Sequence, residues 1–228
     1  MQKFINNPEN LTSELLEGLV LSNPDIITLE QGNLIVNKKL AEADRVTIVT
    51  LGGTGHEPAI SGFVGEGMID ISVAGNIFAA PGPQACVEAI KMADKGHGVL
   101  FVVLNHAGDM LTGNLTMKQV KKLGINVVKV VTQEVLPMLR VKTLTTAAVW
   151  LAAFLCIKLP VLQLLQANPW KRLLLLHKNF ADNMATIAVA TKGAYSSQQP
   201  VWKSLILPKA LWKSAWASMV KAVAVLSR

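Results

Sequence analysis

The sequence predicts an α/β fold, in which a mostly parallel sheet is covered by helices. Two observations in the first 135 residues support this prediction. Short apolar segments alternate with helical segments along the chain. The apolar segments are also continuous rather than alternating with polar residues, which is typical of strands buried on both faces of a sheet. Together these features indicate parallel strands joined by helical crossovers.

Three segments have the spacing and the end signals of helices. In SELLEGLV (13–20) the leucines and valine fall on one face behind a serine that can cap the first turn. In PQACVEAIKMADKG (83–96) a proline opens the segment and Gly96 follows its end. TMKQVKKLG (116–124) also ends on a glycine. We therefore expect helices over these three ranges.

Four segments are predicted to be strands of the sheet. RVTIVTL is rich in β-branched residues and stops at Gly52 and Gly53, and GVLFVVL is apolar throughout. The four predicted strands cover residues 45–51, 69–74, 98–104 and 125–132. Ligands of such sheets bind beyond the carboxyl ends of the strands. The rule indicates two places in this chain, the segments 50–68 and 105–110.

The first of these segments is the glycine-rich stretch TLGGTGHEPAISGFVGEGM. Gly52, Gly53 and Gly55 allow the backbone to approach an oxygen-rich ligand closely. The stretch lacks the GK[ST] of a Walker A loop and is not a full GxGxxG, so a tight structural turn explains the glycines equally well. His56 follows directly, either as an acid–base group or as a loop histidine that caps a helix.

The second segment, NHAGDM, supplies a carboxylate. Asp109 and His56 at neighbouring strand ends could share acid–base chemistry on a hydroxyl group. Asp109 could also be an ordinary turn residue after Gly108. We expect His97 to be structural and His106 to lie at the rim of the site. No cluster of residues suggests a metal site.

Charge is distributed unevenly along the chain. Residues 1–135 hold 10 basic and 14 acidic side chains, whereas residues 136–228 hold 12 basic side chains and one acid, Asp182. The basic residues are scattered rather than gathered on one face with aromatic residues, which argues against a nucleic-acid partner.

The apolar segment 144–157 is shorter than the roughly 20 residues of a membrane span. Two cysteines without a CxxC pair and a polar N-terminus predict a cytoplasmic protein.

Several motifs in residues 1–135 resemble the dihydroxyacetone (glycerone) kinase substrate-binding subunit family, DhaK. They are QKFINNPE (2–9), GGTGHEP (52–58), FVGEGM (63–68) and GHGVLFVVLNHAGD (96–109). The resemblance implies that dihydroxyacetone is bound by Gly53, Thr54, Gly55 and His56, with Asp109 near the reacting hydroxyl. His56 and Asp109 would be the catalytic pair. Leu104 stands where the family commonly has a lysine that contacts the substrate.

The resemblance also implies partners. The chain itself would bind no cofactor or metal, because the phosphoryl group comes from an ADP-carrying nucleotide-binding kinase subunit or from an ATP-binding domain. Family members commonly form homodimers. Some paralogues sense dihydroxyacetone and co-activate transcription instead of supplying the triose for phosphorylation, and Leu104 in place of lysine leaves this alternative open.

The second half resembles the family only after a shift of reading frame. When the last base of each codon is read with the first two of the next, residues 138–150 can encode NAPRENVDNRRGL, and 158–175 can encode an alanine-rich helix. Family-like sequence returns at KNFADNMATIAVATKGA (178–194), with a strand expected at 186–190. We therefore expect a DhaK-like domain over 1–194, of which 136–177 are out of frame.

Residues 195–228 are predicted to be an out-of-frame tail that lacks the family's second domain. In the shifted frame, 210–227 encode an HGE motif, whose histidine holds the substrate covalently in the family. Its codon straddles Ser218 and Met219, so the printed chain has no such histidine. The alternatives are an impaired kinase subunit, a dihydroxyacetone-sensing co-activator and an inactive pseudogene product.

Overall fold

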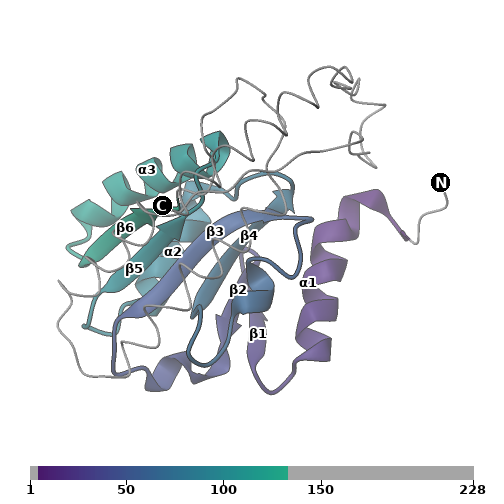
Figure 1. Ribbon diagram of the computed structural model, residues 1–228, viewed down its shortest axis with the longest axis horizontal. Helices are drawn as coiled ribbons and strands as arrows, with labels where there is room; N and C mark the ends of the chain where they lie inside the picture. The colour runs from purple at the N-terminus through teal and green to yellow at the C-terminus, as the bar shows by residue number, and fades with distance from the viewer. Residues whose placement is uncertain (1–4, 133–228) are drawn as a thin grey trace, which may run out of the picture.

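The computed structural model describes residues 5–132, which form a six-stranded sheet with helices on both faces (Figure 1). The strand order is β1-β2-β4-β3-β5-β6. The strands are β1 (Ile27–Glu30), β2 (Leu34–Asn37), β3 (Thr47–Thr54), β4 (Ile71–Ile77), β5 (Val99–Val103) and β6 (Val127–Val131). The helices are α1 (Leu11–Ser22), α2 (Pro83–Ala93) and α3 (Ala107–Lys122), with 3-10 turns at Pro8–Asn10, Lys38–Glu42 and Ser61–Phe63.

The sheet is parallel through its centre and antiparallel at one edge. β3 pairs in parallel with β4 and with β5, and β5 pairs in parallel with β6. β1 and β2 form an antiparallel hairpin, and β2 also runs antiparallel to β4. The prediction of a mostly parallel α/β sheet is therefore confirmed, and all four predicted strands are present. The hairpin was missed because each of its strands has only four residues.

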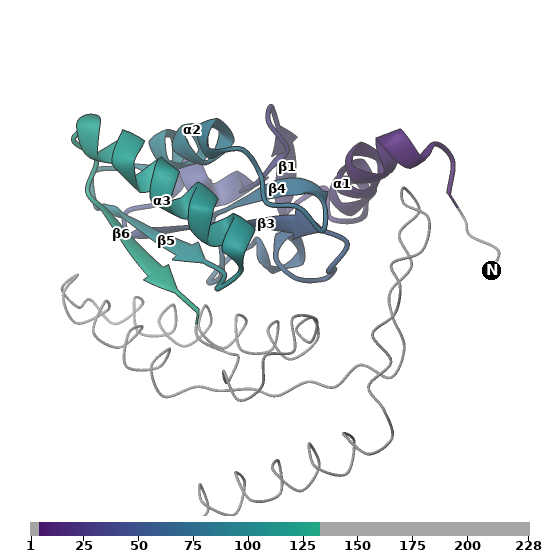
Figure 2. The same ribbon diagram turned by 90° about the horizontal axis from the view of Figure 1, so that it is seen from above.

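The helices form two layers around the sheet, as Figure 2 shows from above. α2 and α3 lie on one face, over a core that includes Val49, Val73 and Phe101. α1 packs against β1 and β4, where Leu16 joins a second apolar cluster with Ile35 and Ala74. Because both faces of β3, β4 and β5 are buried, the sequences of these strands consist mainly of apolar residues.

Helix α3 begins nine residues earlier than predicted, at Ala107 rather than 116. The prediction was wrong at this end because Gly108 and Gly113 lower the helix propensity of the first turns. Gly113 has a packing reason, since a Cβ there would lie 3.0 Å from Cγ2 of Val103 on β5. The early start places Asp109 in the first helical turn rather than in a loop turn.

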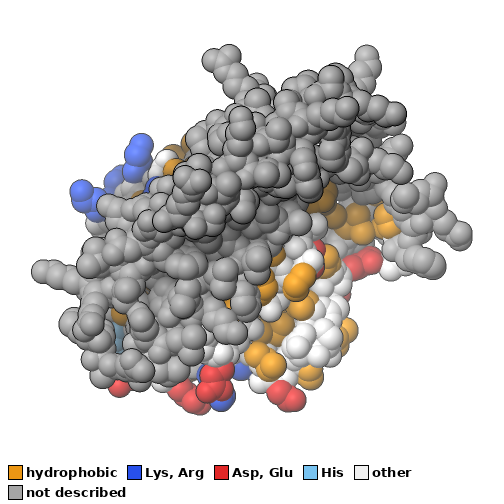
Figure 3. Space-filling view, viewed as in Figure 1, with side chains coloured by type: hydrophobic (Ala, Val, Ile, Leu, Met, Phe, Trp, Pro, Cys, Tyr) orange, Lys and Arg blue, Asp and Glu red, His pale blue; other side chains and the backbone are white. Residues whose placement is uncertain are grey.

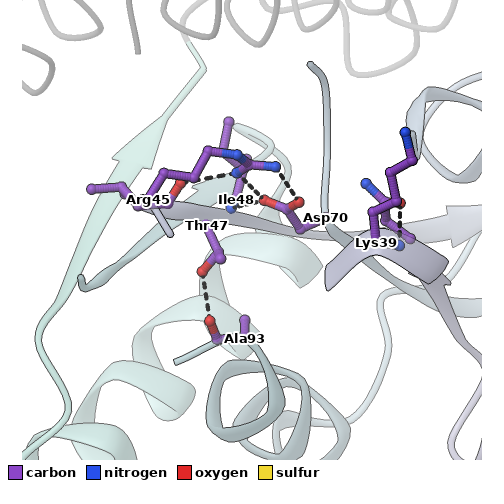
Figure 4. A network of polar contacts seen from close by, with 8 residues as sticks. Lys39, Arg45, Thr47, Ile48, Asp70 and Ala93 are labelled. Atoms are coloured by element: carbon purple, nitrogen blue, oxygen red, sulfur yellow. Dashed lines mark hydrogen bonds and ion pairs between the residues drawn. The ribbon is translucent and has the colours of Figure 1, made fainter. Parts of the chain in front are cut away.

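A buried ion pair joins the amino ends of β3 and β4 (Figure 4). The guanidinium of Arg45 donates to both carboxylate oxygens of Asp70 at 2.8 and 2.7 Å, and Asp70 is completely buried. The N–H of Ile48 also donates to this carboxylate at 2.8 Å. The carboxylate raises the pKa of Arg45, chiefly through the hydrogen bond. This ion pair therefore lies at the opposite end of the strands from their carboxyl ends, where the sequence predicts ligand binding.

On the face drawn in Figure 3, a group of basic side chains of the described residues lies where Figure 1 shows α3, whose last turn carries Lys121 and Lys122. Acidic side chains lie along the lower edge together with some basic ones, and a few acidic side chains are also visible on the right. Among residues 5–132, no helix has the length and apolar character needed to cross a membrane. The predicted out-of-frame segments and the predicted strand at 186–190 lie outside the described residues.

Candidate functional site

The candidate site lies where three parallel strands end side by side. β3 ends at Thr54 and leads to His56, while β4 ends at Ile77 and leads to Phe78. β5 ends at Val103 and leads through Leu104 to Asp109 on α3. Because β4, β3 and β5 are parallel neighbours, all three exits lie at the same edge of the sheet. The two segments that the sequence selects therefore meet at one edge, as the rule for parallel sheets requires.

The turn after β4, residues 78–81, contacts the other two exits. A Cβ on Gly53 would lie 2.6 Å from the backbone nitrogen of Ala79, so Gly53 is required for the turn to pack on β3. On the other side, the Thr112 hydroxyl of α3 donates to the carbonyl of Pro81 at 3.0 Å. The glycines of this loop were expected to serve either ligand approach or a tight turn. In the structure, Gly53 makes room for a neighbouring turn.

The side chain of Thr54 is engaged within the protein. Its hydroxyl is buried and donates to the carbonyl of Gly75 at 3.1 Å. The hydroxyl of Thr12 lies 3.3 Å away, and it must be the donor because the single Thr54 proton is used on Gly75. Only the backbone groups of Thr54 are therefore available to contact a ligand. That Thr54 binds substrate stays a prediction.

We expect Thr54→Val to destabilise the fold by about 1–3 kcal/mol, because the nearly isosteric valine leaves the Gly75 carbonyl and the Thr12 hydroxyl without this partner. Urea unfolding followed by circular dichroism would measure the change in the free energy of unfolding. Thr54→Ser keeps the hydroxyl and is the matched control. A Thr54→Val protein as stable as the native chain would contradict the assignment and return the hydroxyl to the list of ligand contacts.

Gly55 has a left-handed backbone, with φ of +94°, that side chains rarely adopt. Its N–H donates to both carboxylate oxygens of Glu57, at 3.0 and 3.2 Å. The backbone N–H of Gly55, which was expected to contact a ligand, is therefore already bound by the carboxylate of Glu57. A ligand oxygen that binds the Gly55 N–H must displace or share this contact.

His56 is half-buried beside the ring of Phe78. Its imidazole centroid lies 4.9 Å from that of Phe78, with the planes tilted by 59°. Burial, together with the nearby imidazole of His106, lowers the pKa of His56 from 6.5 to about 4. His56 is therefore neutral at physiological pH and can exchange hydrogen bonds with a hydroxyl group. Within residues 5–132, the 3-10 turn that follows His56 has Ile60, not His56, at its N-cap.

Asp109 is only 6% exposed and lies in the first turn of α3. No donor among residues 5–132 is within hydrogen-bonding distance of its Oδ1 atom. Burial raises the pKa of Asp109 from 3.8 to about 7, despite the favourable end of the helix dipole. A carboxyl group with this pKa is close to half ionised at neutral pH, the condition in which a general base is most effective.

Three further residues of the sequence analysis have defined places. Leu104 is 2% exposed in the apolar cluster with Leu16 and Ile60, so it is a core residue here. His97 lies 2.7 Å from Asp44 at the opposite end of β5, as expected for a structural residue. His106 is partly buried at the N-cap of α3, and burial lowers its pKa.

Phe78 and Glu57 were not selected by the sequence analysis, although both contact the predicted loop. GGTGHEP contains Glu57, but its contact with Gly55 depends on the local turn geometry. The sequence around Phe78, NIFAAPGP, does signal a turn through Pro81, Gly82 and Pro83. That signal could have identified a third loop at the same edge. Within the described part of the chain, no three His, Cys, Asp or Glu side chains come together as a metal site.

The chain is similar to several dihydroxyacetone kinase proteins. It is 37% identical over 133 residues to the dihydroxyacetone-binding subunit DhaK of a PTS-dependent dihydroxyacetone kinase from Lactococcus lactis, covering 58% of this chain and 40% of the relative. It is 38% identical over 136 residues to the triokinase/FMN cyclase of Mus musculus, covering 58% of this chain and 24% of the relative. The chain thus spans less than half the length of these relatives.

Solved structures show the same fold. The dihydroxyacetone kinase from C. freundii, in complex with AMP-PNP and Mg²⁺, superposes with a TM-score of 0.77 at 25% identity, over 89% of this chain and 38% of that chain. A dihydroxyacetone kinase operon co-activator superposes with a TM-score of 0.73 at 24% identity, over 82% of this chain and 57% of that chain. The Dak1 domain model matches residues 17–203. The chain therefore belongs to the Dak1 domain family.

Proposed function

We propose that this chain is the dihydroxyacetone-binding subunit of a cytoplasmic dihydroxyacetone kinase. It would present the triose for phosphorylation to dihydroxyacetone phosphate. The observation that carries the proposal is the pair of titratable groups at one sheet edge, a neutral His56 and a buried Asp109 whose pKa lies near 7. The relatives described above are kinases or kinase subunits by name, which supports this substrate and reaction.

In this proposal the two residues have different tasks. Asp109 accepts the proton of the reacting hydroxyl as that oxygen forms its bond to the transferred phosphoryl group. His56, with its lower pKa, stays neutral and exchanges hydrogen bonds with the triose. Gly53, Thr54 and Gly55 contribute backbone contacts. The phosphoryl group comes from ATP or from the nucleotide of a partner kinase subunit, so a nucleotide-binding subunit is the proposed partner, with a homodimer as the proposed assembly.

Isothermal titration calorimetry of the full chain with dihydroxyacetone tests the substrate assignment. We expect saturable binding that His56→Gln weakens by about tenfold or more, because a positioned hydrogen bond to a polar ligand is lost. His97→Gln is the matched control, since His97 lies at the other end of β5. The absence of binding, or equal binding by His56→Gln, would contradict the assignment.

A second candidate function is a dihydroxyacetone-sensing co-activator. Leu104 favours it, because an apolar core side chain occupies the place where the family resemblance implies a substrate-binding lysine. A sensor binds the triose but yields no dihydroxyacetone phosphate. A phosphotransfer assay with the nucleotide-binding subunit therefore separates the two functions, because product formation supports the kinase and triose binding without product supports the sensor.

A further inference from the structure

Phe78 has a backbone conformation that bulky residues rarely adopt. Its φ is +55°, and it follows directly after β4. Two hydrogen bonds hold the turn, from the N–H of Phe78 to the carbonyl of Thr54 at 2.8 Å and from the N–H of Ala79 to the carbonyl of Asn76 at 3.0 Å. A phenylalanine in the left-handed region is strained, and such strain is concentrated at functional sites.

The strained backbone places an apolar ring at the polar loop of the site. Phe78 is 56% exposed, so burial in the core does not explain its presence. The ring lies against the imidazole of His56, with 4.9 Å between centroids. It also fills the space over Gly55, where a Cβ would lie 2.9 Å from the Phe78 Cε1 atom. The Phe78 ring can therefore take this position only because residue 55 is a glycine.

We propose that Phe78 is a positioning residue, whose ring fixes the orientation of the His56 imidazole and shields one side of it from water. The residue does not react, and it acts through His56. Only the identity of the ligand in this inference rests on the proposed function; the contact between the two rings does not. Tyrosine can serve in the same place because it keeps the ring, whereas aliphatic side chains lack the flat surface.

The proposal has a measurable consequence in the titration of His56. Burial is the largest cause of its low pKa, and the ring of Phe78 is one of the groups that bury it. Among residues 5–132, His106, which precedes α3, acts on the titration of His56, and Glu57 and Asp109 are the titratable carboxyl groups at the same edge of the sheet. Loss of the ring admits water on one side of the imidazole and makes its protonation easier.

The test is a pH titration of the four histidines of the full chain by NMR, with His56→Gln to assign the signal of His56. We expect the pKa of His56 to rise from about 4 to above about 5 in Phe78→Ala and to stay near its native value in Phe78→Tyr. His106→Gln measures the contribution of the second imidazole. Leu123→Ala removes an exposed apolar side chain at the far end of α3 and should leave the titration unchanged.

A Phe78→Ala protein in which His56 titrates as in the native chain would overturn the proposal. If Phe78→Ala does not fold, Phe78→Gly removes the same ring and relieves the left-handed backbone, so the titration is then read from that variant. These measurements need no triose.

Dihydroxyacetone binding is then measured in the same variants, with loss of binding expected for Phe78→Ala and retention of binding for Phe78→Tyr. A titration that follows the prediction in a chain that binds no triose would support the positioning role and refute the proposed function.

Discussion

Asp109→Asn is expected to reduce phosphorylation of dihydroxyacetone by about 10²- to 10⁴-fold, because the amide cannot accept the proton of the reacting hydroxyl. The assay uses the full chain with the nucleotide-binding subunit. In the native chain the rate should rise with pH through about 7, where Asp109 loses its proton. Activity of Asp109→Asn within threefold of the native rate would contradict the role of Asp109 as base.

The same substitution has a second readout that does not depend on activity. The folded-state pKa of Asp109 lies above its ordinary value, so its contribution to stability is present below about pH 4 and is lost as the pH rises through about 7. His56 acts in the opposite direction, because its lowered pKa makes the protein lose stability as the pH falls from 6.5 toward 4. Between pH 4 and 6.5 the two effects oppose each other.

Asp109→Asn removes one of these opposing effects. We expect its free energy of unfolding, measured with urea at several pH values, to rise between pH 4 and 6.5 more steeply than that of the native chain. Asp25→Asn is the control, because Asp25 is exposed next to the start of β1, at the amino edge of β4. Parallel curves for the native chain and Asp109→Asn would show that the buried carboxyl group titrates normally.

The sheet edge that carries the site could be predicted from sequence because it depends on strand pattern alone. RVTIVTL is rich in β-branched residues and GVLFVVL is apolar throughout, and the ends of parallel strands coincide, so the exits at His56 and Asp109 had to share an edge. The start of α3 could not be predicted in the same way. Gly113 lowers helix propensity but is selected by its close contact with Val103, which only the packed structure reveals.

The remaining features of the site depend on contacts between distant segments. The low pKa of His56 and the high pKa of Asp109 both result mainly from burial, which a local sequence does not specify. The left-handed backbone of Phe78 is likewise imposed by its hydrogen bond to Thr54 of β3 and by the space above Gly55. A turn could be expected at NIFAAPGP, but not that its phenylalanine would contact His56.

Arg45→Met is expected to destabilise the fold by about 3–5 kcal/mol, because it leaves the buried Asp70 carboxylate without its cation. Asp70 is fully buried and receives both guanidinium hydrogen bonds and the N–H of Ile48 (Figure 4). The ion pair joins the amino ends of β3 and β4, at the edge opposite the site. The loss should therefore appear in the free energy of unfolding and leave the titration of His56 unchanged.

A double variant distinguishes loss of the cation from loss of packing. In Arg45→Met/Asp70→Asn the charge is removed along with its partner, and the asparagine oxygen can still accept from the Ile48 N–H. We expect this double variant to be more stable than Arg45→Met alone, although it carries one more substitution. Lys39→Met is the matched control, since its partner Glu66 is exposed and the pair is screened by water. The loss of stability caused by Asp70→Asn alone is the reference. If adding Asp70→Asn to Arg45→Met lowered the free energy of unfolding by that same amount, the two side chains would act independently. The unpaired buried charge would then not be the reason that Arg45 is needed.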